Sequence, residues 1–404
     1  MSFSFRANPP HSIERGLFVL NQHRDIYSSP TLADVFPSVL SAAGLPDERN
    51  ELNLPPAPRT VVLLIDGLGH ELLQRNCSSA PFLSGQPTTR IKAGFPTTTA
   101  TSLASLCTGV PTGRHGITGY QSYIPEIGGI LNWLQSTVRG HDGEHQLTST
   151  TPIQASTPRT VFVRAVAAGV SCTVVMPAHF RDSGFSRLLL NGADFIGTHA
   201  YGDLLAETVD ASTRADRTLT YCYISELDTV GHNHGPESLG WRTQLQLIDQ
   251  FVKQLAHTLP RSVRLFVTAD HGMIDARRGR AIDIDAESVL TGSVRAISGE
   301  PRCRHLHTVK PAEVAARWTD FLAHDGQVLT RADAIDRGLF GAHLSATAAE
   351  RIGDVLVIAN GATTLMRTKH EPNHSRFPGQ HGGLTSNDQN LWIPGGRTFP
   401  DDDL

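Results

Sequence analysis

Short uninterrupted runs of β-branched and apolar residues are the feature that most constrains how this chain can fold. The first run is Thr60–Ile65, and three more occur at 172–176, 219–225 and 264–268. Such runs are typical of strands that are covered on both faces, as in parallel sheets. Helical patterns lie between them, as at 239–255. Strands that alternate with helices predict an α/β fold with a mostly parallel central sheet flanked by helices.

The rest of the chain is organised around this sheet. We expect an N-terminal helical and irregular lead-in over residues 1–58, followed by an α/β core over 59–272 that carries the chemistry. The pattern changes character over 273–352, which we interpret as a smaller inserted cap region. A further buried strand at 354–359 belongs to 353–404, the predicted C-terminal part of the core.

Composition narrows the classes of function. A net charge of -4 over 404 residues gives no sign of a surface for nucleic acid or anionic membrane. Five scattered cysteines without a CxxC pair favour a reducing cytoplasm over a disulfide framework. We read no signal peptide at the N-terminus, and no apolar run reaches transmembrane length. We therefore expect a cytoplasmic protein that acts on a small molecule, and its oligomeric state does not follow from the sequence.

Acidic residues follow three of the four predicted strands. Asp66, Asp228 and Asp270 come shortly after the first, third and fourth apolar runs. Taken singly, an aspartate before glycine at a strand end is more simply a turn residue. Parallel strands, however, open their carboxyl ends on one edge of the sheet, where ligands bind in α/β proteins. The three carboxylates are therefore expected to converge.

Histidines accompany these carboxylates. His232 lies four residues after Asp228, His271 follows Asp270 directly, and His381 stands in a glycine-rich C-terminal loop. Each histidine alone is more simply a surface or capping residue. Several carboxylates and histidines brought together without cations would be costly to desolvate. Divalent metals resolve this conflict, and Asp/His ligation without cysteine suits zinc, with manganese or iron as alternatives.

A stretch rich in hydroxyl groups, Gly94–Gly109, precedes a short helical pattern. Its Thr and Ser side chains at 97, 98, 99, 101 and 102 fall at the start of that pattern. The first turn of such a helix presents free N–H groups and the positive end of its dipole, which suits a phosphate. A threonine at this place either caps the helix or acts as a nucleophile. A threonine hydroxyl is a poor nucleophile unless a base or a metal activates it.

Five short motifs make the chain resemble the alkaline phosphatase superfamily, and specifically its type I phosphodiesterase/nucleotide pyrophosphatase family. In chain order the motifs are Val62–Gly67, Phe95–Thr99 with Thr108–Gly109 and His115–Ile117, Asp228–Pro236, Thr268–Met273 and His381–Thr385. They span most of the chain and follow the order of the family. The resemblance implies an alkaline phosphatase-like fold and a hydrolase of phosphodiester or pyrophosphate bonds, with nucleotide-like substrates favoured.

The resemblance also implies two metal ions, most simply zinc. The first would be held by Asp228, His232 and His381. The second would be held by Asp66, Asp270 and His271, with the hydroxyl of Thr99 as a further ligand. In the family motif Phe-Pro-Thr-Lys-Thr the last threonine is the nucleophile. That position is Thr99 here, which implies hydrolysis through a phosphothreonine intermediate.

Two positions depart from the family pattern. The family's lysine is Thr98 here, and its asparagine, which helps to hold the phosphoryl oxygen, falls on Tyr120. A tyrosine still donates one hydrogen bond, from a longer and stiffer arm. We assign Thr98 and Tyr120 as substrate-binding positions that bear on the class of substrate. A phosphomonoesterase or phosphonate hydrolase on the same metal site is the nearest alternative, and a catalytically idle metal-binding family member is another.

Overall fold

A five-stranded parallel sheet forms the centre of the structure, a computed structural model that describes residues 26–140, 143–146 and 157–394. The strand order is β10-β1-β9-β7-β8, and every neighbouring pair is parallel. The strands are β1 (Arg59–Ile65), β7 (Ser171–Pro177), β8 (Asp194–Thr198), β9 (Thr218–Ile224) and β10 (Val263–Thr268). The four apolar runs are all strands of this sheet, which confirms the predicted fold class. Strand β8 was not predicted, because it lies at the sheet edge and is largely half-exposed.

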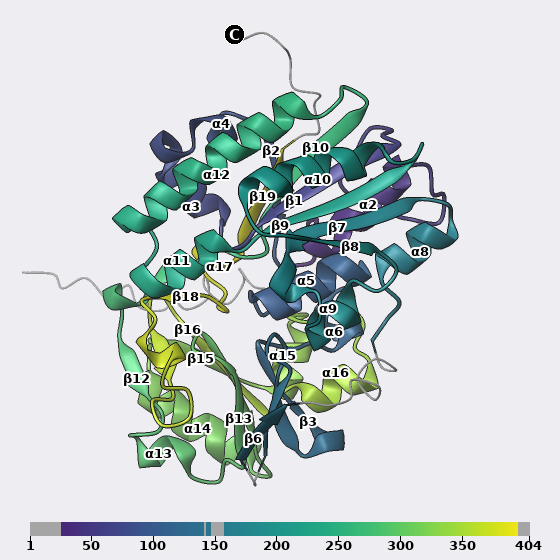
Figure 1. Cartoon of the computed structure of the whole chain (residues 1–404). Helices are drawn as coiled ribbons and strands as arrows, with labels where there is room; N and C mark the ends of the chain where they lie inside the picture. Colours follow the sequence, from purple (N-terminus) through teal and green to yellow (C-terminus); the bar gives the residue numbers. More distant parts are fainter. Residues whose placement is uncertain (1–25, 141–142, 147–156, 395–404) are drawn as a thin grey trace, which may run out of the picture.

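Helices flank the central sheet in the upper half of the view in Figure 1. They are α2 (Val35–Ala42), α3 (His70–Arg75), α4 (Pro81–Ser84), α5 (Thr99–Thr108), α6 (Thr112–His115), α8 (Val161–Ala167), α9 (Gly184–Leu189), α10 (Tyr201–Thr213), α11 (Glu226–His234) and α12 (Leu239–Thr258). Helix α12 follows the predicted pattern, with Trp241, Leu245 and Ile248 buried along one face. Helix α10 packs against β1, β7 and β9.

A second sheet of four antiparallel strands lies below the first in Figure 1. It contains β13 (Ala296–Glu300), β14 (Cys303–His307), β15 (Gly326–Thr330) and β16 (Val355–Ala359), with helices α13 (Ser288–Thr291), α14 (Pro311–Leu322), α15 (Arg331–Asp336) and α16 (Ala346–Arg351) in the same part of the chain. The strand predicted at 354–359 is therefore present, and it pairs with β14 and β15 instead of joining the central sheet. The proposed domain boundaries stay a prediction, and residues 1–25 of the lead-in lie outside the described part of the chain.

Smaller strand pairs complete the fold. A third antiparallel sheet contains β3 (Gln121–Ile124), β4 (Gly129–Asn132), β5 (Thr137–Gly140) and β6 (Gly143–Gln146). Three two-stranded pairs are β2 (Thr88–Lys92) with β19 (Asn390–Pro394), β11 (Ile274–Asp275) with β18 (Gly379–Gln380), and β12 (Ala281–Asp283) with β17 (Thr364–Met366). The short helix α17 (Ser386–Gln389) precedes β19.

The segment before α5 is fixed by apolar contacts to the second sheet. Phe95 is fully buried in a cluster that includes Cys303 and Leu356, and its ring centroid lies 5.5 Å from that of Phe340. Apolar burial of this kind stabilises the position of the helix start that follows. The start of α5 is therefore held between the central and the second sheet.

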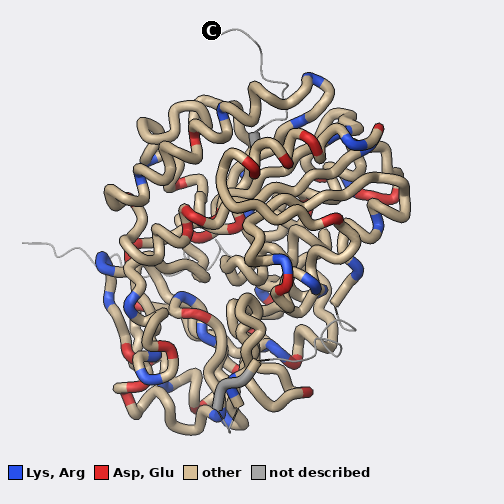
Figure 2. Tube along the Cα trace, viewed as in Figure 1, with Lys and Arg blue, Asp and Glu red and all other residues tan. Residues whose placement is uncertain are grey.

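Surface and thiol features agree with the composition. Acidic and basic residues are interspersed along the trace, without a basic block (Figure 2). All five cysteines lie in the described residues and are unpaired, and Cys77 alone among them is exposed. None of the described helices combines the length and the apolar character needed to cross a bilayer.

Candidate functional site

Three carboxylates meet at the carboxyl edge of neighbouring strands. Asp66 directly follows β1, Asp270 lies just after β10, and Asp228 is in the first turn of α11, which follows β9. Because β10, β1 and β9 are adjacent, the parallel arrangement places all three side chains at one edge. Asp66 and Asp270 are buried, and the side chain of Asp228 is 13% exposed.

Strand pairing brings the histidines to the same place. Strand β11 begins three residues after His271, and it pairs with β18, which ends just before His381. The two imidazole rings stack with centroids 3.7 Å apart. A Cβ at Gly379 would lie 2.3 Å from the carbonyl oxygen of Gly231, so glycine is required for the close approach of α11 to β18. This approach places His232 beside the loop that carries His381.

Each of the three histidines donates a hydrogen bond from Nδ1 to a backbone carbonyl. The acceptors are Gly272 for His271 at 2.9 Å, Gly379 for His232 at 2.8 Å and Thr97 for His381 at 3.0 Å. A carbonyl oxygen only accepts, so the proton of the neutral imidazole is on Nδ1 and the Nε2 lone pair is free. Backbone bonds of this kind orient metal-binding histidines.

The free Nε2 atoms converge without protons between them. The Nε2 atoms of His232 and His381 are 3.2 Å apart, and Nε2 of His232 is 3.3 Å from Oδ2 of Asp228. Nε2 of His271 is 3.5 Å from Oδ1 of Asp66 and 3.4 Å from Oδ2 of Asp270. Burial, followed by the neighbouring His271 and His232, holds the pKa of His381 well below its ordinary value. The imidazole of His381 is therefore in the neutral form that binds a metal.

Several carboxylate oxygens at this edge have no donor. Oδ1 of Asp66, Oδ1 of Asp228 and Oδ2 of Asp270 are buried without a hydrogen-bond partner among the described residues. Burial, and then the charges of Asp270 and Asp228, raise the pKa of Asp66 well above its ordinary value. Buried acceptors that lack donors are expensive unless a cation satisfies them. The donor set of carboxylate oxygens and imidazole nitrogens therefore fits a divalent metal such as zinc.

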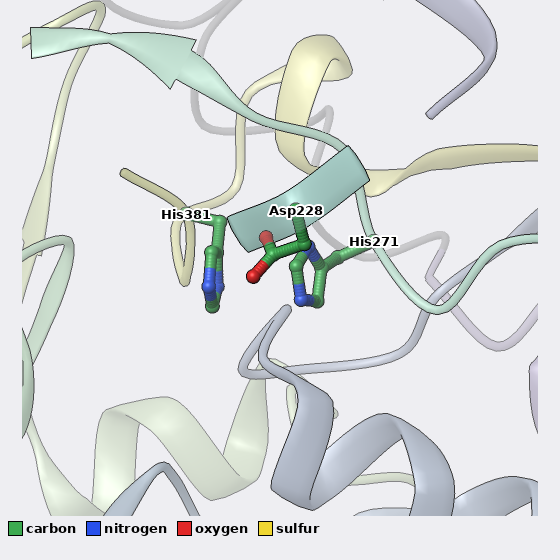
Figure 3. Close-up of side chains that lie close together, drawn as sticks. All are labelled: Asp228, His271 and His381. Atoms are coloured by element: carbon green, nitrogen blue, oxygen red, sulfur yellow. The ribbon is translucent and has the colours of Figure 1, made fainter. Parts of the chain in front are cut away.

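Two groups of possible ligand atoms each lie within 4.8 Å of one another. One contains Asp66, Asp270 and His271, as predicted, and the other contains Asp228, His271 and His381. The second group is shown in Figure 3, where its three side chains point toward one another. His271 thus stands between the two groups, while His232 contacts Asp228 and His381 from the outer side. The sequence did not indicate this central place of His271.

Thr99 is the first residue of α5, and its hydroxyl lies 3.1 Å from Nε2 of His271. Because that nitrogen carries no proton, the Thr99 hydroxyl is the donor. The hydroxyls of Thr97 and Thr101 donate instead to the carbonyls of Gly383 and Ile117. Of the five hydroxyls at the start of α5, all in the described part of the chain, that of Thr99 is the one in contact with a candidate metal ligand. The helix start directs its free N–H groups toward the same place.

The two assigned substrate-binding positions have different surroundings. Thr98 is fully buried at the N-cap of α5, and its side chain makes no capping hydrogen bond. The hydroxyl of Tyr120 accepts a hydrogen bond from Nδ2 of Asn132 at 2.7 Å and lies 3.2 Å from Nε2 of His374. Burial lowers the pKa of His374, so its imidazole is neutral where it meets the Tyr120 hydroxyl. The tyrosine is therefore already engaged at both ends of its hydroxyl.

A cavity of about 210 Å³ opens beside the hydroxyl of Thr99. Its polar lining includes Thr99, Asp66 and Asp228, together with hydroxyl residues from other segments: Ser183, Ser186, Ser225 and Thr229. The remaining lining is mainly aliphatic and aromatic: Leu103, Cys107, Leu134, Met176, Phe180, Phe185, Leu189, Leu190, Tyr221 and Tyr223. No pattern in the sequence indicates this cavity, because its lining comes from several elements, among them α5, β7, α9 and β9, and depends on how they pack.

Comparisons with known proteins agree with this arrangement. The sequence model of the family described as type I phosphodiesterase / nucleotide pyrophosphatase matches residues 60–384. Three curated proteins match over shorter stretches. GPI ethanolamine phosphate transferase 1 of Gibberella zeae is 31% identical over 74 residues, which are 17% of this chain and 8% of that protein. Ectonucleotide pyrophosphatase/phosphodiesterase family member 7 of Homo sapiens is 33% identical over 78 residues, 18% of this chain and 17% of that protein.

The third curated relative is the bis(5'-adenosyl)-triphosphatase ENPP4 of Bos taurus, 32% identical over 81 residues, 19% of this chain and 18% of that protein. The matched stretch is thus less than a fifth of the length of each curated relative. Among solved structures, murine ectonucleotide pyrophosphatase/phosphodiesterase 5, in an inactive form in complex with AMP, has a TM-score of 0.63. It is 17% identical, and the match covers 83% of this chain and 87% of that one, so the two share a fold.

Proposed function

Because this chain belongs to the type I phosphodiesterase/nucleotide pyrophosphatase family, we propose that it is a two-metal hydrolase of phosphodiester or pyrophosphate bonds. Nucleotide-like substrates are favoured, and Thr99 is the nucleophile. The observation that carries this proposal is the contact of the Thr99 hydroxyl with Nε2 of His271 at 3.1 Å, beside three aspartates that each keep one buried carboxylate oxygen without a hydrogen-bond partner in the described structure.

The ligands divide into two sets. Asp66, Asp270 and His271, with Thr99, would hold one ion, and Asp228, His232 and His381 would hold the other. Zinc is favoured by this donor set. When bound, the two ions supply the Lewis acidity that lowers the pKa of a hydroxyl and neutralises charge on a phosphoryl group. The backbone bonds of the three histidines hold their Nε2 atoms in place for this role.

Thr99 acts on the phosphorus atom. Its oxygen forms a bond to phosphorus while the ester bond to the leaving group breaks; the hydroxyl proton passes to solvent, and the departing oxygen takes up a proton from solvent. Water then attacks the phosphothreonine, which releases the phosphorylated product and restores the hydroxyl. The N–H groups at the start of α5 face the phosphoryl oxygens and favour their negative charge.

The cavity beside Thr99 supports a nucleotide-like substrate. A flat aromatic base fits an apolar lining, and rings such as those of Phe180 and Tyr223 offer faces for stacking. The solved structure of the murine relative in complex with AMP is in keeping with a small phosphorylated ligand. A phosphomonoesterase or phosphonate hydrolase would use the same ligands, and would have no need of a cavity for a second substituent.

Metal analysis combined with a substrate panel tests the proposal. We expect about two zinc ions per chain and faster hydrolysis of bis-p-nitrophenyl phosphate and dinucleotides than of p-nitrophenyl phosphate. Faster hydrolysis of the monoester would establish the phosphomonoesterase instead. A protein that retains no metal and turns over none of these compounds would be the catalytically idle family member.

A further inference from the structure

Glu300 is a buried carboxyl group that the chemistry above does not use. It ends β13 at the tip of the hairpin with β14, and 4% of it is exposed. Its Oε2 accepts a hydrogen bond from the backbone N–H of Tyr120 at 2.9 Å. Its Oε1 is buried without a hydrogen-bond partner of good geometry among the described residues. A buried acceptor without a partner costs free energy of folding, so we expect a function of this carboxyl group that offsets the cost.

Glu300 also reaches the loop of His381. A Cβ added at Gly382, the next residue after His381, would lie 2.5 Å from Cγ and 2.9 Å from Cδ of Glu300. Gly382 has a φ of +113°, which L side chains rarely adopt. The glycine therefore lets the loop run directly against the carboxyl group. A change in the length of the Glu300 side chain would shift the backbone beside His381.

The start of α5 meets the same carboxyl group. The hydroxyl of Thr98, the residue before Thr99, lies near Glu300 and lowers its pKa, although neither this hydroxyl nor Oε1 of Glu300 has a hydrogen-bond partner of good geometry among the described residues. Burial is the larger effect and raises the pKa of Glu300 to about 8, against the smaller effects of Tyr120, Thr98 and Arg304. Near neutral pH the carboxyl group is therefore largely protonated, so it can both donate and accept. A glutamine has the same length and offers the same two functions.

We propose that Glu300 is a positioning residue, which fixes the start of α5 and the His381 loop relative to each other through Thr98, Gly382 and the backbone of Tyr120. Glu300 has no contact with the ligand atoms themselves in the described structure. It touches the neighbour of the nucleophile and the neighbour of one candidate ligand. A displacement of about 1 Å at reacting groups can reduce a rate about 100-fold. The inference rests on the proposed function, since it concerns how Thr99 is placed.

The test compares Glu300→Ala, Glu300→Asp and Glu300→Gln in the full chain, assayed with excess zinc. We expect kcat to fall about 100-fold in the Ala and Asp variants, with KM little changed, because the nucleophile is misplaced while the substrate cavity is intact. Glu300→Gln should restore kcat to near the wild-type value. The Asp and Gln variants keep the comparison possible if the Ala variant does not fold.

A matched control separates positioning from stability. Asp249 is another fully buried carboxyl group that accepts backbone hydrogen bonds, from Phe82 and Leu83. Asp249→Ala should lower Tm without lowering kcat. Three results would overturn the inference. The first is a wild-type kcat in Glu300→Ala, and the second is a loss of kcat in Glu300→Gln as large as that in Glu300→Ala. The third is a kcat that follows Tm across all variants, including Asp249→Ala. Failure of the wild-type protein to hydrolyse any diester would instead contradict the proposed function.

Discussion

Tyr223→Phe should weaken metal binding, because the Tyr223 hydroxyl donates a hydrogen bond to Oδ2 of Asp66. Asp66 is 3% exposed, and its other oxygen has no donor among the described residues. The bond lowers the pKa of Asp66 against the effect of burial. Without the hydroxyl, Asp66 keeps its proton to higher pH, and a metal must displace that proton. Outer-shell hydrogen bonds of this kind orient and tune ligating carboxylates.

The size of the effect follows from the charge on Asp66. A hydrogen bond to a charged group contributes about 1.5–3 kcal/mol, and about 1.4 kcal/mol is a factor of ten in an equilibrium constant. We therefore expect the zinc affinity of Tyr223→Phe to fall roughly 10- to 150-fold, which overlaps the range of about 10- to 100-fold found for outer-shell partners. Competition with a chromophoric chelator at fixed pH measures this change directly.

The neighbouring strand position supplies the control. Tyr221 lies on the same strand, is fully buried, and its hydroxyl has no hydrogen-bond partner in the described part of the chain. Tyr221→Phe removes the same atom without removing a bond to Asp66, so its zinc affinity should equal that of the wild type. The reasoning fails if Tyr223→Phe binds zinc as tightly as the wild type, or if both variants are weakened equally.

Two further predictions concern pH and packing. Zinc affinity should fall as the pH is lowered, by up to about tenfold per pH unit for each proton displaced, because burial and the charges of Asp270 and Asp228 raise the pKa of Asp66, whose proton zinc must displace. An affinity that does not change in calorimetric titrations across the pH range in which the protein stays folded would contradict this. On α12, Leu245→Ala should lower the free energy of unfolding by about 2–5 kcal/mol, because Leu245 is fully buried. The same substitution at Leu247, which is 53% exposed, should change the free energy of unfolding by less than about 0.5 kcal/mol. Equal losses of unfolding free energy in the two variants, measured by urea denaturation, would refute the assignment of Leu245 to the core.

The central sheet could be predicted because its strands are buried on both faces and therefore appear as continuous apolar runs. Strand β8 was not predicted, because it lies half-exposed at the edge of the sheet and its sequence therefore contains no continuous apolar run. The convergence of Asp66, Asp228 and Asp270 follows from parallel strands, and β10, β1 and β9 are indeed neighbours. The second sheet could not be inferred, because its pairing joins segments as distant in the sequence as β14 and β16 and leaves no local pattern.

The residues that support the site could not be predicted from the sequence. Tyr223 looked like one more apolar residue of a buried strand, and its contact with Asp66 depends on the register of β9 against β1. Glu300 carries no motif, and its importance appears once the hairpin tip meets Thr98, Tyr120 and Gly382. His271 belongs to both ligand groups, and this shared place likewise depends on the pairing of β11 with β18. Tertiary contacts, and not local sequence, determine these features.

The central claim is that Thr99 is the nucleophile of a metal-dependent diester hydrolysis, and the turnover of zinc-loaded Thr99→Ala tests it most directly. Ser102→Ala is the matched control, since Ser102 is a buried residue of the same helix whose hydroxyl has no partner in the described structure. At equal zinc content, we expect Thr99→Ala to hydrolyse bis-p-nitrophenyl phosphate at no measurable rate and Ser102→Ala to keep the wild-type rate. Hydrolysis by Thr99→Ala at the wild-type rate would contradict the account.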